Sequence, residues 1–326
     1  MIRVPHTTLR GTGFLTNGAR LRRVLHRLHR TTPIDVLEGS DTGLAMIEKT
    51  FPAAKVIRMH GGHHFFAVTL GQQPRAWRSW QEVRSFACAD HLCAVSHFVG
   101  EQTRALLHLG QRPIEVLPNP VDVQRFKPIS TPEERGLIMF VGTVTEKKGV
   151  RQLVEAMPQI VARIPHAQLW IVGRDSRDAR GQSYSAQLQQ QLPASVQPHI
   201  HFKGAVEHDG LPALLARASV CVYPSHMEAL PLAWIEGLAM GKALVASQTG
   251  PGAEVIDDGV SGLLCDPHNA ASIAEKIIRL LDDEALRTQL GRAARQRAET
   301  VFSLDVMVGR NEAFYRRCVE EKRNGS

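Results

Sequence analysis

The feature that most constrains the fold is a repeated alternation of short β-rich runs and helical patterns after residue 137. The candidate strands are LIMFVG (137–142), QLWIVG (168–173), IHFKG (200–204), SVCVYP (219–224) and KALVAS (242–247). Helical spacing of apolar residues marks VRQLVEAMPQIVARI (150–164), LPALLARA (211–218) and PLAWIEGLAM (231–240). Such alternation predicts a parallel sheet covered on both faces by helices, which binds ligands beyond the carboxyl ends of its strands.

Residues 1–117 show a looser version of the same pattern. Strand-like runs lie at KVIRMHG (55–61), LCAVS (92–96) and IEVLPNP (114–120), and helices are expected near 75–88 and 97–108. The proline-rich polar stretch 118–136 is typical of an interdomain linker. We therefore predict two α/β domains, at 1–125 and 126–301, followed by a C-terminal helix at 302–326 that crosses back to the first domain. A length of 326 residues suits two domains.

Composition indicates a globular, reduced, cytoplasmic protein. The chain is 43% hydrophobic and 22% charged, which is enough to build cores. No apolar run approaches the ~20 residues that a membrane span needs. The start, MIRVPHTTLRG, lacks the apolar core of a signal peptide. Five cysteines, an odd number, are typical of free cytosolic thiols rather than a disulfide framework.

The net charge of +7 is concentrated early in the chain, around RLRRVLHRLHR (20–30). Leu21, Val24, Leu25 and Leu28 fall on one helical stripe there, with arginines elsewhere. One interpretation is attraction to anionic lipid headgroups or a phosphorylated acceptor, at the inner face of the membrane. The other, slightly favoured, is a solvated helix face over an ordinary core. Nucleic acid is not an expected partner, because no aromatics interleave with the basic residues.

The turn after the 137–142 run, in FVGTVTEKKGVRQLVEAM (140–157), has the parts of an anion site. Lys147 and Lys148 precede a helix expected from Val150, and Gly149 lets the backbone turn. Free N–H groups, the helix dipole and an ammonium group would converge there. The spacing is not that of a P-loop. The alternative is a capped turn with surface lysines.

The stretch EALPLAWIE (228–236) places two glutamates at the ends of an apolar segment. Pro231 suits the first turn of a helix and not its interior, so Glu228 is expected in the preceding loop and Glu236 inside the helix. The two carboxylates are therefore not an acid/base pair on one helical face. Glu228 is placed to meet a ligand and Glu236 to reach another part of it. The alternative for Glu236 is a partner within its own helix.

A third turn, QTGPGAEVIDDGVSGLL (248–264), is glycine-rich and follows the 242–247 run. Gly250 and Gly252 permit close backbone approach. In a parallel sheet this turn, the lysine turn and the Glu228 loop share one edge. That convergence predicts a phosphate-bearing ligand.

These three segments, in this order and spacing, resemble the donor domain of family 4 retaining glycosyltransferases, and the likeness covers most of residues 90–320. The resemblance implies the GT-B fold, in which two Rossmann-like domains with parallel sheets face each other across a cleft. It implies that Glu228 touches the donor sugar, Glu236 the ribose and Lys148 the phosphates. It also implies that the backbone amides near Leu232 and Ala233 contact the diphosphate and that the backbone near Ala205 and Val206 contacts the base. The other donor-side positions that it implies are Gly142, Thr143, Ala229 and Leu230.

The resemblance also implies a metal-independent reaction with retention, in which a leaving phosphate oxygen takes the acceptor's proton. His60 matches the family's first-domain histidine facing the donor sugar, and with Lys148 and Glu228 it completes the implied catalytic set. A plain turn histidine is an equal alternative for His60. No cofactor and no metal are expected, since Cys88 and Cys93 are too far apart for a zinc knuckle and the HGGHH run (60–64) is best explained by turn histidines.

Three departures from the family stand out. Thr143 replaces an arginine near the diphosphate, and Pro231 replaces a glycine that is frequent in relatives and can donate an N–H. Relatives also open with a strand and a glycine-rich loop, for which Gly11 and Gly13 are a poor substitute, so the first domain is expected to be incomplete.

We therefore expect a retaining hexosyltransferase that moves a sugar from a nucleotide-sugar to a saccharide or lipid-linked acceptor, in surface polysaccharide or glycolipid synthesis. The alternative is a truncated, catalytically impaired nucleotide-sugar-binding relative. A nucleotide-sugar epimerase is a weaker third interpretation, because acid/base groups are expected on only one side of the sugar.

Overall fold

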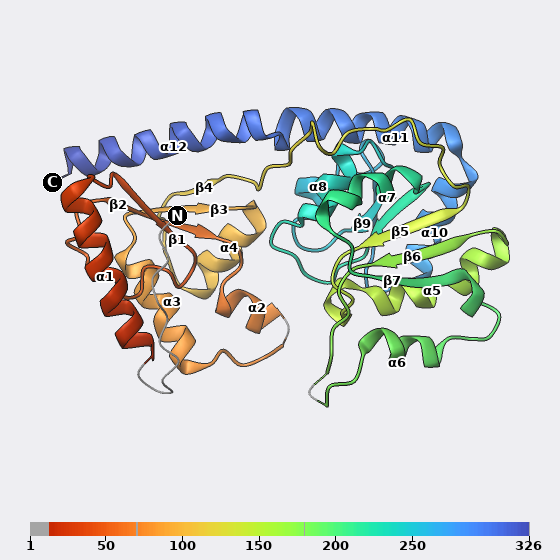
Figure 1. The fold of residues 1–326 in the computed structure, drawn as a ribbon, viewed down its shortest axis with the longest axis horizontal. Helices are drawn as coiled ribbons and strands as arrows, with labels where there is room; N and C mark the ends of the chain where they lie inside the picture. The colour runs from red at the N-terminus through yellow and green to blue at the C-terminus, as the bar shows by residue number, and fades with distance from the viewer. Residues whose placement is uncertain (1–12, 70, 179, 326) are drawn as a thin grey trace. The chain divides into compact units, whose positions relative to one another are not determined.

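The computed structural model describes residues 13–69, 71–178 and 180–325, so Gly11 lies outside the described residues. The chain forms two compact units. One holds the described residues up to Pro118 and those from Val308 onward, and the other holds Asn119–Met307. Each unit is built on its own parallel sheet with helices around it (Figure 1). The expected class, α/β with two Rossmann-like domains of parallel sheet, is confirmed.

The second unit has a six-stranded parallel sheet in the order β10-β9-β8-β5-β6-β7. Its strands are β5 (Leu137–Val141), β6 (Gln168–Val172), β7 (Ile200–Gly204), β8 (Val220–Tyr223), β9 (Leu244–Ser247) and β10 (Leu263–Cys265). The five strands predicted for this region are confirmed. The sequence did not reveal β10, because a three-residue strand inside a glycine-rich stretch carries no periodicity.

Helices pack on both faces of this sheet (Figure 1). They are α5 (Val150–Arg163), α6 (Tyr184–Gln191), α7 (Leu211–Arg217), α8 (Leu232–Ala239), α9 (Gly252–Val255), α10 (Ala270–Asp282) and α11 (Glu284–Arg297). The core is apolar and continuous, with Ile138 of β5, Leu153 of α5 and Ile277 of α10 fully buried. Helix α8 begins directly after Pro231, as predicted.

The first unit has a four-stranded parallel sheet in the order β1-β2-β3-β4. The strands are β1 (Val36–Gly39), β2 (Ala54–Met59), β3 (His91–Ala94) and β4 (Ile114–Val116), and the helices are α1 (Gly13–Thr31), α2 (His63–Thr69), α3 (Ala76–Cys88) and α4 (His97–Leu106). Strand β1 and helix α2 were not predicted. His63 and His64, interpreted as turn residues, are the first residues of α2, because the apolar residues that follow extend the helical conformation.

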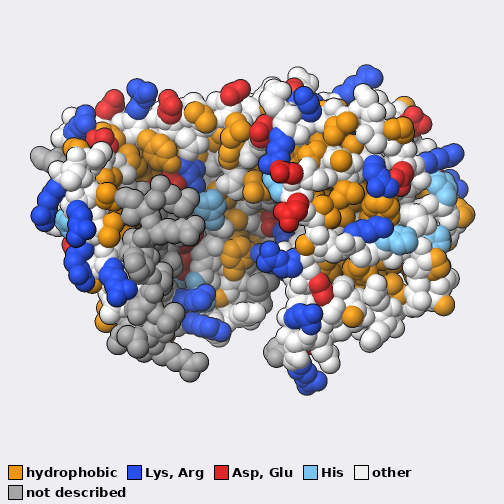
Figure 2. All heavy atoms as spheres, in the orientation of Figure 1, with side chains coloured by type: hydrophobic (Ala, Val, Ile, Leu, Met, Phe, Trp, Pro, Cys, Tyr) orange, Lys and Arg blue, Asp and Glu red, His pale blue; other side chains and the backbone are white. Residues whose placement is uncertain are grey.

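Helix α1 carries the early positive charge. Its apolar stripe is half-buried, and the rings of His26 and His29 contact Phe51 at 5.3 and 5.5 Å. Arg23 and Arg27 are exposed, and basic side chains gather over this helix in Figure 2. The helix therefore presents a solvated basic face above a partly buried apolar one.

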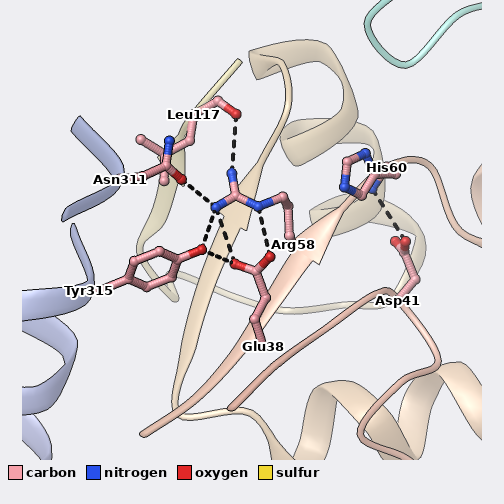
Figure 3. Close-up of polar contacts among 7 residues, drawn as sticks. All are labelled: Glu38, Asp41, Arg58, His60, Leu117, Asn311 and Tyr315. Atoms are coloured by element: carbon pink, nitrogen blue, oxygen red, sulfur yellow. Dashed lines mark hydrogen bonds and ion pairs between the residues drawn. The ribbon is translucent and has the colours of Figure 1, made fainter. Parts of the chain in front are cut away.

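Helix α12 (Leu304–Asn324) belongs to the first unit from Val308 onward. It is held there by Arg58 of β2, whose guanidinium donates to Asn311 at 2.6 Å, to Tyr315 at 2.9 Å and bidentately to Glu38 at 3.0 and 3.1 Å (Figure 3). Tyr315 also donates to Glu38, at 2.7 Å. The segment 119–136 contains no helix or strand and packs on the second unit through the buried Phe126.

Within the described ranges, none of the helices combines the length and the apolar character that crossing a membrane requires. The five cysteines are buried and unpaired, as expected from the odd count. Burial raises the pKa of the Cys93, Cys221 and Cys265 thiols to about 12, so they remain neutral core side chains.

Candidate functional site

Three turns at the carboxyl ends of adjacent strands β5, β8 and β9 are joined to one another. The His226 N–H, in the turn after β8, donates to the carbonyl of Lys147 in the turn after β5, at 2.9 Å. The Thr249 hydroxyl, after β9, donates to the carbonyl of His226 at 3.1 Å. The prediction that the lysine turn, the Glu228 loop and the glycine turn share one sheet edge is confirmed.

The lysine turn depends on Gly149. This residue ends a short 3-10 helix (Glu146–Lys148) with φ 69° and starts α5. A Cβ at this position would lie 1.8 Å from the carbonyl oxygen of Pro224, so only glycine lets the turn lie against the loop after β8. Burial lowers the pKa of Lys147. The turn is therefore a tightly packed part of the site and not a solvated surface loop.

The side chains of Lys148 and Glu228 form an ion pair at this edge. Nζ of Lys148 lies 2.5 Å from Oε1 of Glu228, and Glu228 is only 8% exposed. A paired carboxylate in this setting is costly to leave without its cation, because burial penalises a lone charge. Glu228 lies in the loop between β8 and α8, as Pro231 predicted.

Glu236 has a different partner. It lies in α8, is 9% exposed, and its Oε1 is 2.8 Å from Nε2 of His208. His208 follows β7, two residues after Val206. Glu236 therefore reaches the turn of another strand and does not pair within its own helix. The two glutamates have different partners, so they do not form one acid/base pair.

The other predicted donor-side residues lie along the same edge of the second unit. Gly142 and Thr143 follow β5, Ala205 and Val206 follow β7, Ala229 and Leu230 precede α8, and Leu232 and Ala233 are its first two residues. The first N–H groups of a helix have no intrahelical acceptor, so those of Leu232 and Ala233 are available to an anion. His60 follows β2 and belongs to the first unit.

His60 is held through its backbone, since its N–H donates to Oδ2 of Asp41 at 3.3 Å (Figure 3). Burial lowers the pKa of the His60 imidazole, and the nearby Arg58 charge lowers it further. The neutral ring is therefore favoured.

Two features of the site were missed from the sequence. His208 could not be identified, because nothing local links it to Glu236. The second is Glu146, which accepts from Arg151 at 2.5 and 3.0 Å and from the Tyr184 hydroxyl at 2.5 Å. The bonds from Arg151 and Tyr184 lower the pKa of Glu146 to about 2 and fix the start of the lysine turn. In the sequence, the only sign of this network is the short separation of Glu146 and Arg151.

Over residues 13–69, 71–178 and 180–325, no three His, Cys, Asp or Glu side chains converge closely enough to hold a metal ion. Lys148 supplies a positive charge at the site, and the N-termini of helices add the positive ends of their dipoles.

Comparison with known proteins identifies the family. Residues 122–297 match the model of glycosyl transferases group 1, and residues 2–125 match that of glycosyltransferase family 4. The glycogen synthase of Mycobacterium tuberculosis is 31% identical over 238 residues, covering 72% of this chain and 54% of that protein. The chain thus spans about half the length of that relative.

Two further proteins are similar over longer stretches. A GDP-mannose-dependent monoacylated phosphatidylinositol monomannoside mannosyltransferase of Corynebacterium glutamicum is 27% identical over 82% of this chain and 72% of its own length. The structure of Anabaena HepE in complex with UDP shares the fold, with a TM-score of 0.77 and 17% identity over 95% of this chain and 84% of that one. The chain belongs to the group 1, family 4 glycosyltransferases and has their GT-B fold.

Proposed function

We propose that this protein is a retaining hexosyltransferase. It transfers a sugar from a nucleotide-sugar to a saccharide or lipid-linked acceptor in surface polysaccharide or glycolipid synthesis. The observation that carries the proposal is the ion pair between Lys148, in the turn after β5, and Glu228, in the loop before α8, in a chain of this family. The relatives' names, a GDP-mannose-dependent mannosyltransferase and a glycogen synthase, support the same class of reaction.

The ion pair suggests how the donor binds. A diphosphate at the N-terminus of α8 competes with Glu228 for the Lys148 ammonium, because phosphate carries more charge than one carboxylate. Binding therefore frees Glu228 to accept hydrogen bonds from the donor sugar. Glu236 holds the ribose hydroxyls, and backbone near Ala205 and Val206 meets the base.

The chemistry needs no metal in this proposal. Lys148 and the amides of Leu232 and Ala233 stabilise the charge that develops on the departing diphosphate. Thr143 adds no positive charge there, so the site depends more heavily on Lys148. A leaving phosphate oxygen takes the proton of the acceptor hydroxyl as the new bond forms on the same face, with retention. His60, whose neutral ring is favoured, is the residue of the first domain that the family resemblance assigns to the donor sugar.

We also propose a cytoplasmic protein that contacts the inner face of the membrane peripherally. The first unit exposes Trp77 (51%) and Trp80 (45%), whose rings stack at 5.0 Å, and Phe14 of α1 contacts both. Tryptophan favours the headgroup region, and arginine favours anionic lipid. The aromatic group of Phe14, Trp77 and Trp80 lies beside the basic helix α1, which supports a lipid surface as partner.

The test is incubation with a panel of UDP- and GDP-sugars and candidate acceptors, with products read by mass spectrometry and anomeric configuration by NMR. Glycosylated product of retained configuration, formed equally with EDTA present, is expected. Donor binding without transfer or hydrolysis would instead identify the impaired binding protein. Conversion of one nucleotide-sugar into its epimer would identify an epimerase.

A further inference from the structure

The turn that carries His60 rests on two buried carboxyl groups from other elements. Asp41, in the loop after β1, is 5% exposed, and Glu82, in α3, is 1% exposed. Neither residue lies on β2 or α2, the strand and the helix on either side of residues 60–62. Carboxyl groups buried this deeply are uncommon, because burial penalises the ionised form.

Each carboxyl group fixes one end of this turn. The His60 N–H donates to Oδ2 of Asp41 at 3.3 Å (Figure 3). The His64 N–H donates to Oε2 of Glu82 at 3.0 Å, and Nδ1 of His64 lies 2.5 Å from the same oxygen. The backbone is therefore tied on both sides of Gly61 and Gly62.

The second oxygen of each carboxyl group is buried and has no hydrogen-bond partner among the described residues: Oδ1 of Asp41 and Oε1 of Glu82. Both acids pack against Gly62. A Cβ there would lie 1.7 Å from Oε1 of Glu82 and 2.9 Å from Cβ of Asp41. One proton between the two unpartnered oxygens would supply a hydrogen bond to both.

Electrostatics favour the same arrangement. Two adjacent carboxylates in a buried site do not both ionise readily. Burial raises the pKa of Asp41 to about 6, and the charge of Glu82 raises it as well.

We propose that Asp41 and Glu82 are positioning residues for His60, that they share one proton, and that this shared proton and the two backbone hydrogen bonds fix the segment at residues 60–64. Among the described residues, the titratable groups that face Glu82 are His63 and His64, at the start of α2, and His60 contacts Asp41 through its backbone N–H. Arg58 and Glu38 in turn face His60.

The shared proton is measured directly by infrared spectroscopy of protein labelled with ¹³C at the aspartate carboxyl groups. Ordinary aspartates are ionised at about pH 5, so the band of a protonated aspartate at that pH reports a carboxyl group with a raised pKa. We expect this band at about pH 5 and its loss by about pH 7.5. It should be absent in Asp41→Asn and retained in the control Glu101→Gln, which alters an exposed glutamate on α4. A wild-type protein without the band would overturn the proposal.

Sharing is tested by Glu82→Gln. Removing the neighbouring charge should move the midpoint of the aspartate band to lower pH. An unchanged midpoint would mean that Asp41 holds its proton alone, and the pair would be rejected.

The role in positioning His60 rests on the proposed function. We expect Glu82→Ala to lower kcat by about 10- to 100-fold, the scale of a small misplacement of a reacting group, while UDP affinity stays within about twofold. Glu82→Gln, which keeps an acceptor for the His64 N–H, should recover most of the activity. An equal loss of UDP affinity would indicate general unfolding and contradict a positioning role. If the wild-type chain transfers no sugar, the proposed function fails. The infrared measurement still decides, independently, whether Asp41 and Glu82 share a proton.

Discussion

Nζ of Lys148 lies 2.5 Å from Oε1 of Glu228, although the two residues are 80 positions apart in the chain. Strands β5 and β8 are neighbours in the sheet, so the turns that follow them meet. Glu228 neutralises the ammonium group of Lys148, which a bound diphosphate would also need. Ligand binding and release of Glu228 are therefore linked in the proposed mechanism.

Glu228→Gln tests that link. The amide keeps the shape of the side chain and releases Lys148 from a competing negative charge. We expect UDP affinity, measured by calorimetry, to stay equal or rise, and transfer to fall by about 100-fold because contacts to the sugar weaken. Glu275→Gln, at an exposed position on α10, is the control and should change neither quantity. Full transfer activity in Glu228→Gln would contradict the proposed role.

The ribose contact of Glu236 is tested by comparing UDP with 2′-deoxy-UDP. A hydrogen bond to a charged group contributes about 1.5–3 kcal/mol, so the wild type should prefer UDP by roughly tenfold or more. Glu236→Ala should bind the two nucleotides equally. His208→Ala should weaken both together, because it leaves the buried Glu236 carboxylate without its partner. A preference that survives in Glu236→Ala would place the ribose elsewhere.

Gly149→Ala should destabilise the second unit. The residue has φ 69°, which is unfavourable for alanine, and the added Cβ would overlap the carbonyl oxygen of Pro224. We expect a loss of about 3 kcal/mol or more in the free energy of unfolding, measured with denaturant. Gly181→Ala is the matched control, with φ 78° and no atom within 4 Å of the new Cβ, and should cost only about 1 kcal/mol. Equal effects of the two substitutions would show that the close contact is unimportant.

Stability should depend on pH through Asp41. Its carboxyl group keeps a proton up to about pH 6 in the folded protein, against an ordinary value of 3.8. Between these values the folded state binds more protons than the unfolded state, so the free energy of unfolding falls as pH rises. The contribution is complete below about pH 4 and is lost as pH rises through 6. We expect Asp41→Asn to remove up to about 1.4 kcal/mol per pH unit of this slope. If the free energy of unfolding changed with pH equally in the variant and the wild type, Asp41 would not be the source of the pH dependence.

Membrane contact should require the exposed aromatic pair. We expect Trp77→Ala together with Trp80→Ala to reduce cosedimentation with vesicles rich in anionic lipid by about tenfold, since each ring contributes to interfacial binding. Val260→Ala, an equally exposed apolar position in the second unit, is the control and should bind as the wild type does. Binding that persists in the double variant would assign membrane contact to another surface, or to charge alone.

Much of the architecture was predictable because the local spacing of apolar residues indicates it. Five strands and three helices of the second unit, the position of Pro231 before α8 and the shared edge of three turns follow from the order of short apolar runs and turn residues. Strands β1 and β10 and helix α2 escaped prediction, and so did the longer helices α6, α10 and α11.

The sequence by itself determined which residues reach the carboxyl edges of the strands, because a βα turn is specified by the residues within it. Only the tertiary structure decided their partners: Lys148 for Glu228, His208 for Glu236, and the packing of Asp41 and Glu82 against Gly62. Those contacts depend on which strands lie side by side and how deeply each side chain is buried. Both properties come from long-range packing, which local patterns do not contain.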